Sequence, residues 1–320
     1  MTPKIAIVGA TGLVGRKMLQ ILEEREFPFL DITLMASSRS AGTKIPFNGI
    51  EHEVQELKED SFNDIDIALF SAGGETSKKF SPIAANSNCI VIDNSSAWRM
   101  DPDVPLIVPE VNPEEIKNHK NIIANPNCST IQLVVALKPL QDKFGINRVI
   151  CSTYQSISGA GQKGVDKLRH EINTGESEDG SKPIAFNTSF HPLEENGFTN
   201  EENKMLNETR KIMGLPELKL AYTCVRLPIL GGHAESVNLE LDKVFTIEEI
   251  KSTLSAAEGI EVFEDSDYPT PLIADDTDPV YVGRLRKDDS APNGLYMWVV
   301  ADNLRKGAAL NAVQIAEKLI

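Results

Sequence analysis

The stretch IAIVGATGLVG, residues 5–15, decides the fold of this 320-residue chain. Four apolar residues run without a break to Gly9, and apolar residues at helical spacing follow from Val14 to Leu22. A continuous apolar run indicates a strand that is covered on both faces, as in a parallel sheet between helices. A strand, a glycine-rich turn and a helix in this order are typical of the start of a nucleotide-binding α/β fold.

The glycines of this turn have the spacing G-x-x-G-x-x-G, at Gly9, Gly12 and Gly15. Glycines let the backbone approach a pyrophosphate closely, and the first turn of a helix offers free N–H groups. The spacing alone is weak evidence, but its place between a strand and a helix is the context expected of a dinucleotide site. A glycine-rich turn that binds nothing is the alternative.

The two halves of the chain have different apolar patterns. Further short continuous runs lie in the first half, at residues 32–36, 65–70, 90–92, 106–108 and 122–124. They predict a doubly wound, Rossmann-like parallel sheet. Longer and more alternating runs follow, at residues 149–156, 218–225, 237–241 and 295–300. They predict a mainly antiparallel sheet with helices on one side, an α+β domain. A capping box at residues 246–249 predicts one of these helices. The amphipathic segment 307–320 predicts a last helix that returns to the first domain.

We therefore expect an α/β protein with two domains. Residues 1–127 plus 304–320 form the cofactor-binding domain, and residues 128–303 form the second, catalytic domain.

Composition excludes several classes of protein. The net charge is −15, which disfavours binding to nucleic acid or to an anionic membrane. No apolar run reaches the roughly 18 residues of a membrane span, and no signal-peptide pattern precedes the first strand. The four cysteines include no C-x-x-C pair and the five histidines no H-E-x-x-H motif. We expect a cytoplasmic protein without a metal site.

The end of the second predicted strand indicates which dinucleotide is bound. An NAD site usually has Asp or Glu there to accept hydrogen bonds from the ribose hydroxyls. This chain has instead Ser37, Ser38, Arg39 and Ser40. Hydroxyls and a guanidinium suit a 2′-phosphate, so we expect NADP. An exposed loop arginine without a ligand is the alternative.

Cys128 is the candidate nucleophile. It lies in the polar turn at residues 125–130, at the start of an apolar helix, where the helix dipole stabilises a thiolate. Cys89, Cys151 and Cys224 lie in apolar runs and are read as core residues. A thiolate beside a nicotinamide predicts one chemistry. It adds to an aldehyde, the adduct loses a hydride, and a second nucleophile cleaves the thioester.

Four motifs together resemble the aspartate-β-semialdehyde dehydrogenase family, in the shorter type of Gram-positive bacteria. They are GATGLVG at 9–15, NPNCST at 125–130, YQSISGAG at 154–161 and VRLPILGGH at 225–233. The resemblance implies NADPH-dependent reduction of L-β-aspartyl phosphate to L-aspartate-β-semialdehyde, with release of phosphate, in the biosynthesis of lysine, threonine and methionine. It also implies a homodimer that is formed through the second domain.

The resemblance implies a role for each matching residue. Cys128 is the nucleophile, Gln155 orients the substrate or thioester, and His233 is the general acid and base. Arg226 binds the substrate carboxylate, and Glu201, rather than its neighbour Glu202, faces the substrate ammonium because it shares a helix face with Lys204. The predicted substrate-binding set is Arg99, Asn127, Glu201, Lys204 and Arg226, with Arg99 and Lys204 as phosphate ligands. The predicted cofactor-binding set is Gly9, Thr11, Gly12, Leu13, Val14, Ser37, Ser38, Arg39, Ser40, Ser71, Gly73, Thr76, Asn94, Ser158, Gly159, Gly161 and Asn303.

Simpler interpretations exist for single residues. His233 can be a structural histidine and Arg226 an ordinary ion-pair partner. His52, His119, His170 and His191 are read as surface or structural residues. The nearest enzyme alternative is N-acetyl-γ-glutamyl-phosphate reductase, whose cysteine motif differs. A non-catalytic paralogue would lack Cys128 or His233, and a nucleic-acid sensor would need a basic stripe.

Overall fold

The computed structural model describes residues 2–177 and 182–320. The chain forms two compact units, Met1–Asn127 with Ala308–Ile320, and Cys128–Gly307. The second boundary lies after residue 307, whereas the boundary expected from the sequence lies after residue 303. Within the intervening segment the Arg305 guanidinium binds the carboxylates of Asp276 and Asp278, which belong to the second unit.

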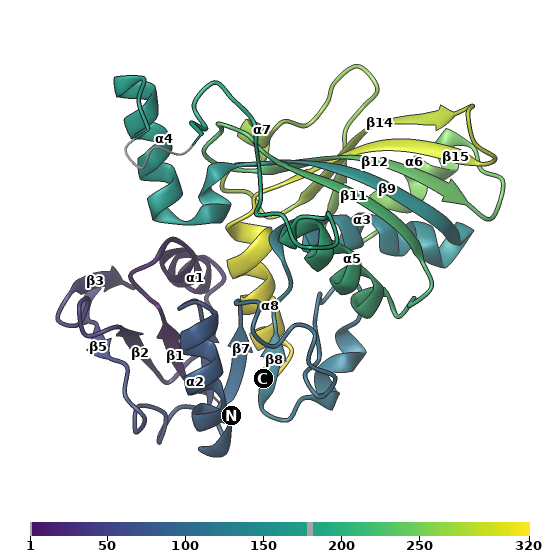
Figure 1. Ribbon diagram of the computed structural model, residues 1–320. Helices are drawn as coiled ribbons and strands as arrows, with labels where there is room; N and C mark the ends of the chain where they lie inside the picture. The colour runs from purple at the N-terminus through teal and green to yellow at the C-terminus, as the bar shows by residue number, and fades with distance from the viewer. Residues whose placement is uncertain (1, 178–181) are drawn as a thin grey trace. The chain divides into compact units, whose positions relative to one another are not determined.

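The first unit is built on a six-stranded parallel sheet of order β5-β2-β1-β6-β7-β8 (Figure 1). Its strands are β1 (Lys4–Val8), β2 (Asp31–Ala36), β5 (Gln55–Glu56), β6 (Ile67–Phe70), β7 (Ile90–Asp93) and β8 (Ile122–Ala124). From β1 the chain first builds outward through β2 and β5, and then returns to β6 on the other side of β1. This reversal between β1 and β6 is the switch point at which doubly wound sheets bind ligands.

Helices cover both faces of this sheet. They are α1 (Leu13–Glu24), α2 (Gly74–Asn86) and α8 (Leu310–Glu317), and a small hairpin of β3 (Lys44–Phe47) with β4 (Ile50–Glu53) and a 3-10 helix at Pro113–Asn118 complete the unit. Ile5 and Ile7 of β1 share one hydrophobic core with α1 and α8. The intervening Ala6 and Val8 point to the opposite face because strand side chains alternate.

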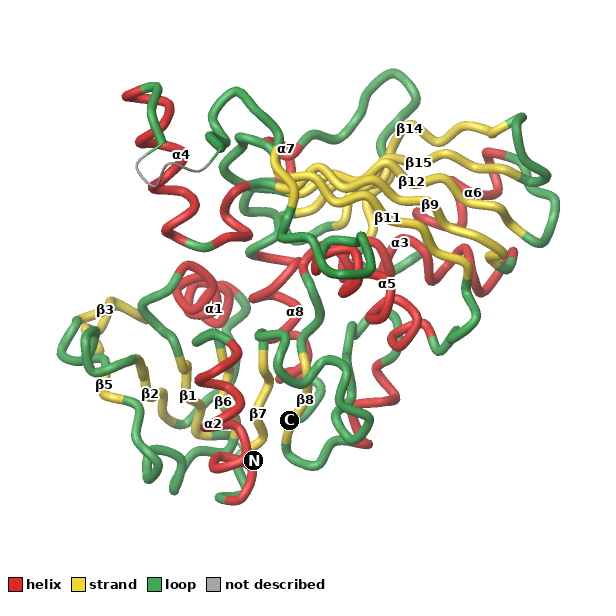
Figure 2. The backbone as a smooth tube through the Cα atoms, in the orientation of Figure 1, coloured by secondary structure: helices red, strands yellow, loops and turns green. Residues whose placement is uncertain are grey.

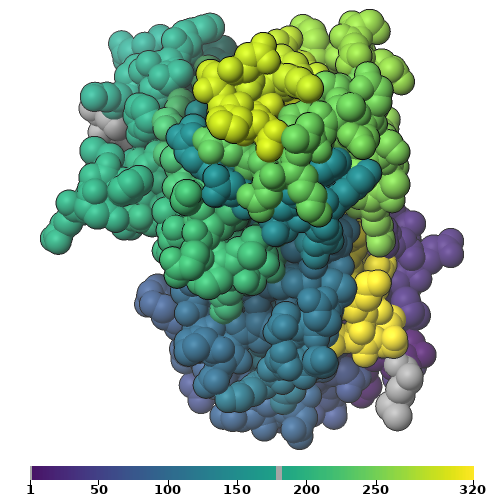
Figure 3. All heavy atoms as spheres, turned by 90° about the vertical axis from the view of Figure 1, so that its right-hand side faces the viewer, coloured from purple at the N-terminus to yellow at the C-terminus, as the bar shows by residue number. Residues whose placement is uncertain are grey.

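The last helix returns to the first unit, as predicted. α8 contacts α1, β6 and β7, and Arg25 at the end of α1 binds Glu317 at the end of α8 with two hydrogen bonds of 2.7 and 2.8 Å. In the space-filling view of Figure 3 the yellow C-terminal residues lie against the purple N-terminal ones. The prediction for segment 307–320 is confirmed.

Residues 106–108 do not form the predicted strand. Leu106 makes a single bridge to Ala124, and Ile107 donates one hydrogen bond to the same residue. Pro105 and Pro109 flank this run, and a proline has no N–H group to extend a ladder. The apolar run is buried beside β8 without becoming a strand.

The second unit contains a seven-stranded sheet of order β10-β11-β9-β12-β15-β14-β13 (Figure 2). Its strands are β9 (Ile146–Gln155), β10 (Ser189–Phe190), β11 (Lys219–Arg226), β12 (His233–Leu241), β13 (Ile260–Val262), β14 (Val280–Asp288) and β15 (Gly294–Ala301). Most neighbouring pairs are antiparallel, while β11–β9 and β13–β14 are parallel. The predicted fold class, a doubly wound domain followed by a mainly antiparallel one, is confirmed.

Three helices pack together on this sheet. α3 (Cys128–Phe144) contacts α5 (Asn200–Met213), α6 (Ile247–Ser255) and the central strands. α4 (Gln162–Thr174), α7 (Pro271–Ala274), a 3-10 helix at Ile157–Ala160 and a π-helical turn at Arg305–Ala309 lie outside this layer. The predicted capping box at Thr246 and Glu249 is present at the start of α6. In the part of the chain that the structure describes, no helix has both the length and the apolar character of a membrane span.

Candidate active site

The sheet register of the second unit brings three predicted site residues into one row. Arg226 is the last residue of β11, Gln155 the last of β9, and His233 the first of β12. Arg226 pairs with Gln155, and Gln155 pairs with His233. Because residues that pair across neighbouring strands point to the same face, the guanidinium, the amide and the imidazole are presented together.

Cys128 and His233 are in contact. Cys128 is the first residue of α3, and its Sγ lies 3.3 Å from Nε2 of His233. The positive end of the helix dipole favours a thiolate at this position. Gly307 lies opposite the cysteine, since a Cβ added to Gly307 would come within 3.0 Å of the Cβ of Cys128. No local sequence pattern predicts this approach of Gly307 to Cys128, because it depends on the fold.

The hydrogen bonds of His233 assign its proton. The backbone N–H of Ser156 donates to Nδ1 at 3.0 Å, and an amide N–H can only donate. The single proton of the neutral imidazole is therefore on Nε2, which faces the sulfur of Cys128. Burial, together with the positive charge of Arg226, lowers the pKa of His233 to about 3. The ring is neutral at physiological pH.

A buried polar network holds the imidazole from behind. The side-chain oxygen of Asn303 accepts hydrogen bonds from the Ser156 hydroxyl at 2.9 Å and from the Gly232 backbone at 3.0 Å. The Ser158 hydroxyl lies 3.2 Å from the same oxygen. Ser158 and Asn303 were predicted to bind the cofactor, and the structure shows both buried and hydrogen bonded to each other and to Ser156.

Gln155 connects this row to α5. Its Nε2 donates to the Ser129 hydroxyl at 2.6 Å and to the Glu201 carboxylate at 3.2 Å. Lys204, one helical turn further along α5, lies 3.3 Å from the same carboxylate. Glu201 therefore faces the predicted site.

Glu202 has a different task. Its carboxylate accepts the backbone N–H of Thr199 at 2.7 Å, as the return half of a capping box, and the backbone N–H of Cys224 at 3.0 Å. Both carboxylate oxygens of Glu202 are thus used to begin α5 and to fix it to β11. Glu202 is therefore occupied by backbone N–H groups, whereas Glu201 faces the predicted site, as expected from the sequence.

Arg226 is fixed close to the backbone that precedes α4. Its Nη1 donates to the Ser156 carbonyl at 2.5 Å. A Cβ at Gly159 would lie 2.7 Å from this nitrogen and 3.4 Å from Nε2 of His233. Gly159 was predicted to bind the cofactor. In the structure this position also requires a glycine, because a side chain would collide with the guanidinium.

His191 was expected to be a surface or structural residue, and the structure places it among the predicted site residues. Its Nε2 lies 2.7 Å from Oε1 of Gln155 and 3.4 Å from Nη2 of Arg226. The ring is half-buried and belongs to the same cluster as the predicted site residues. No spacing rule connects His191 to Gln155, which is 36 residues away.

The predicted phosphate ligand Arg99 lies in the first unit. Its Nε donates to the Asn125 carbonyl at 3.0 Å and its Nη2 to the Asn94 carbonyl at 2.9 Å. The side chains of Asn94 and Asn125 bind each other at 2.7 Å. Asn127 is buried and ends the first of the two segments of this unit, so it directly precedes Cys128 in the chain.

A cavity of about 490 Å³ opens at the carboxyl ends of β1, β2 and β6. Eight predicted cofactor residues line it: Gly9, Thr11, Gly12, Ser37, Arg39, Ser40, Ser71 and Thr76. Val8, Ala36, Leu57, Ala72 and Phe80, which the sequence analysis did not single out, complete the lining. Leu13, Val14, Ser38, Gly73 and Asn94 lie in the same unit outside the lining, and Ser158, Gly159, Gly161 and Asn303 belong to the second unit.

Gly9 shows why the turn beside this cavity needs glycine. Its φ is +89°, and a Cβ there would come within 2.3 Å of the Ser71 carbonyl oxygen. A Cβ at Gly15 would in turn lie 2.3 Å from the carbonyl oxygen of Gly9. The glycines therefore permit the close packing of β1, β6 and α1 that brings backbone N–H groups to the cavity.

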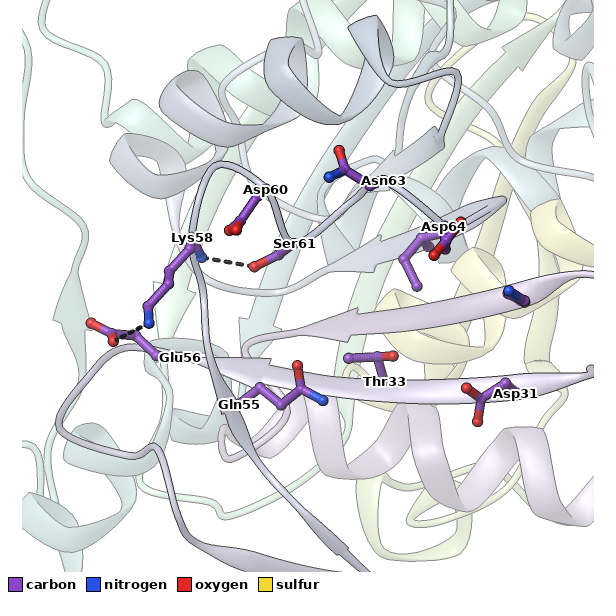
Figure 4. A pocket seen from close by; sticks show the side chains of 11 residues that line it. Asp31, Thr33, Gln55, Glu56, Lys58, Asp60, Ser61, Asn63 and Asp64 are labelled. Atoms are coloured by element: carbon purple, nitrogen blue, oxygen red, sulfur yellow. Dashed lines mark hydrogen bonds and ion pairs between the residues drawn. The ribbon is translucent and has the colours of Figure 1, made fainter.

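A larger hollow of about 570 Å³ lies at the other end of the same sheet, beside the amino ends of β1 and β2. Figure 4 shows the carboxylates of Asp31, Asp60 and Asp64 around it. Glu56 adds a fourth carboxylate and is paired with Lys58 at 3.4 Å. This concentration of negative charge repels phosphate, so the smaller cavity fits a dinucleotide better.

The remaining cysteines are core residues, as predicted. Cys89, Cys151 and Cys224 are buried, and burial raises the pKa of each thiol, to about 12 for Cys89. These thiols stay protonated and unreactive. Across residues 2–177 and 182–320, no three His, Cys, Asp or Glu side chains are grouped so as to hold a metal ion.

Comparison with known proteins connects both units to one family. The model of the semialdehyde dehydrogenase NAD binding domain matches residues 4–119, and the model of the semialdehyde dehydrogenase dimerisation domain matches residues 137–306. The chain is 54% identical over 332 residues to the aspartate-semialdehyde dehydrogenase of Aquifex aeolicus, with 99% of this chain and 98% of the relative covered.

Solved structures agree with this result. The fold is similar to that of aspartate semialdehyde dehydrogenase II from Vibrio cholerae complexed with ASA, with a TM-score of 0.96, 48% identity, and 100% and 98% of the two chains covered. It is also similar to aspartate semialdehyde dehydrogenase with NADP from Candida albicans, with a TM-score of 0.81, 29% identity, and 100% and 98% covered. The chain therefore belongs to the aspartate-semialdehyde dehydrogenase family.

Proposed function

We propose that this chain catalyses the NADPH-dependent reductive dephosphorylation of L-β-aspartyl phosphate to L-aspartate-β-semialdehyde and phosphate, a reaction of lysine, threonine and methionine biosynthesis. The observation that carries the proposal is the 3.3 Å contact between Cys128 Sγ at a helix start and the neutral His233 ring. Gln155 and Arg226 lie in the same row of the sheet. A nucleophile, a hydrogen-bond donor and an anion-binding group are what acyl transfer through a thioester requires.

In the first half of the reaction the Cys128 thiolate attacks the acyl carbon of the substrate. A C–S bond forms, the carbonyl oxygen takes the negative charge, and the C–O bond to phosphate breaks as the carbonyl reforms. His233 presents an Nε2–H at the sulfur, so it can stabilise the thiolate before attack and the oxyanion during attack. The product of this half is a thioester on Cys128 and free phosphate.

In the second half the thioester is reduced. NADPH, when bound, supplies the hydride for the carbonyl carbon. Cys128 is then released as a thiolate when the C–S bond breaks, and the aldehyde leaves. The same residues run the reverse direction, in which phosphate cleaves the thioester.

The charged residues of the site suit the groups of this substrate. Arg226 offers a guanidinium for the α-carboxylate, because two parallel N–H donors match a carboxylate. Glu201 offers a carboxylate for the α-ammonium group, and its place beside Gln155 supports this role. We assign phosphate to Lys204 and Arg99, with Asn127 as a further substrate ligand.

We further propose that the cofactor is NADP. Ser37, Arg39 and Ser40 line the cavity of the first unit, and none of the described residues around that cavity is Asp or Glu. A 2′-phosphate would meet a guanidinium and hydroxyls there and no carboxylate to repel it. The Candida albicans relative, which was solved with NADP, supports the same choice.

We also propose that the protein acts as a homodimer in the cytoplasm. The match of residues 137–306 to a dimerisation domain supports the dimer. Four free cysteines in the structure suit a reducing compartment. Light scattering after gel filtration measures the mass, and a monomer at micromolar concentration contradicts the dimer.

The test of the proposed reaction is an assay of NADPH formation from L-aspartate-β-semialdehyde, NADP and phosphate. We expect turnover that depends on phosphate, and a Cys128 peptide acylated by the substrate in mass spectra of a mixture without phosphate. C128S should lose turnover, while the control C89A, which removes a buried thiol of the first unit, should keep it. Turnover by C128S at the natural rate, or a preference for N-acetyl-glutamate-γ-semialdehyde, contradicts the proposal.

A further inference from the structure

We propose that His191 is a positioning residue of the active site, whose Nε2–H fixes the amide of Gln155 and through it the Glu201 carboxylate that meets the substrate. The kinetic part of this inference rests on the proposed function. The structural part rests on the hydrogen-bond network alone.

The fold brings His191 to the site through an edge strand. His191 directly follows β10, whose Ser189 pairs with Arg226 and whose Phe190 pairs with Val225 of β11. Arg226 in turn pairs with Gln155 of β9. Ser189 therefore continues the row Arg226–Gln155–His233 across β10, and His191, two residues further on, reaches the side chains of Gln155 and Arg226.

The partners of Gln155 allow only one orientation of its amide. A carboxylate and Gln155 Oε1 are both acceptors, so the nitrogen of the amide must face Glu201. The oxygen then faces His191, at 2.7 Å from its Nε2. For this contact to be a hydrogen bond, Nε2 of His191 must carry the proton. One arrangement, in which His191 donates to Gln155 and Gln155 donates to Glu201, satisfies both polar atoms of the Gln155 amide.

Arg226 restricts His191 to the neutral form. Nη2 of Arg226 lies 3.4 Å from the same Nε2, and both nitrogens are donors, so two positively polarised groups face each other. Burial, together with the positive charges of Arg226 and Lys204, lowers the pKa of His191 to about 4, although Glu201 and Glu202 act in the opposite direction. At physiological pH the ring therefore offers one N–H, and Gln155 receives it.

Without this donor, the side-chain oxygen of Gln155 has no partner that fixes the orientation of the amide. Gln155 is fully buried, and a buried carbonyl oxygen without a partner is unfavourable by about 1–3 kcal/mol. Rotation of the amide by half a turn would then place its oxygen against the Glu201 carboxylate. Glu201 would have to move, and its proposed contact with the substrate ammonium would weaken.

The experiment compares two replacements of His191. H191Q keeps a donor near the position of Nε2, while H191L fills a similar volume without one. We expect H191L to lower kcat/KM for L-aspartate-β-semialdehyde about tenfold, chiefly through KM, because about 1.4 kcal/mol corresponds to a factor of ten. The KM for NADP should not change. H191Q should recover most of the loss, and H52L, which removes an imidazole from the first unit, should behave like the natural chain.

Two results would overturn the inference. One is an H191L enzyme with natural kinetics, and the other is an H191Q enzyme as impaired as H191L. A second measurement is made on the natural protein and requires neither enzyme activity nor a variant. Long-range 1H–15N spectra of the natural protein labelled in its histidines should show the Nε2–H tautomer for His191 near pH 7. An Nδ1–H tautomer or a charged ring refutes the network even if the enzyme is active, whereas an inactive natural chain with the expected tautomer refutes only the proposed function.

Discussion

Glu235 is a buried acid in the core of the second unit. It lies on β12, two residues after His233, and is fully buried. Within residues 2–177 and 182–320, neither of its carboxyl oxygens has a hydrogen-bond partner. Burial raises the pKa of Glu235 well above its ordinary value, and the nearby amide of Gln132 offsets this only in part. The folded protein therefore keeps a proton that the unfolded chain releases above about pH 4.5.

This proton makes the fold less stable as the pH rises. Where the folded state binds one proton more than the unfolded state, the free energy of unfolding falls by about 1.4 kcal/mol for each pH unit. The loss begins near the ordinary pKa of a glutamate and continues up to the pKa of Glu235 in the fold. E235Q removes the titrating group. The variant should therefore gain about 1.4 kcal/mol per pH unit relative to the natural chain, starting near pH 5.

Urea unfolding at pH 5, 6, 7 and 8, followed by circular dichroism, measures this difference. The buried amide of the new glutamine changes the free energy of unfolding by the same amount at every pH. The prediction is therefore tested by the slope of the difference in this free energy against pH. E261Q, which changes an exposed carboxylate of β13, is the control and should give a flat line. A flat line for E235Q as well would refute the reasoning, because Glu235 would then be ionised in the fold.

Other predictions follow from single contacts. R39A should raise the KM for NADP with little change in the KM for NAD. An unchanged ratio of these two KM values in steady-state assays would show that Arg39 does not determine the cofactor preference. G9A should abolish NADPH binding in titration calorimetry, because its Cβ would lie 2.3 Å from a carbonyl oxygen; natural affinity would contradict this. T199A removes an N-cap and should lower the urea stability by about 1 kcal/mol. His191 and His233 are neutral in the fold, so stability should fall as the pH drops below about 6.5, where the unfolded chain takes up protons; H191Q should show a smaller fall.

Local patterns predicted much of the fold. The run from β1 through Gly9 to α1 depends on residues that are neighbours in sequence, and Cys128 at the start of α3 is of the same kind. The choice of Glu201 over Glu202 was also available locally. Thr199 and Glu202 have the spacing of a capping box, which assigns the second glutamate to the helix start.

Features that depend on pairing across the sheet were beyond reach. His191 enters the site because β10 pairs with the end of β11, and a two-residue strand leaves no periodic signal. Gly307 lies against Cys128 through a turn that is distant in sequence. The apolar run 106–108 was misjudged because burial, rather than strand pairing, explains its composition.

The return of the last helix sets an order on synthesis. Ala309, Leu310, Val313 and Ile315 belong to the core that Ile5 and Ile7 begin. The ribosome makes β1 and α1 well before this helix, because the whole second unit lies between them in the chain. The first unit therefore cannot complete its core until the second unit has been synthesised, so a stop codon that precedes α8 should leave the first unit, rather than its neighbour, exposed to proteases.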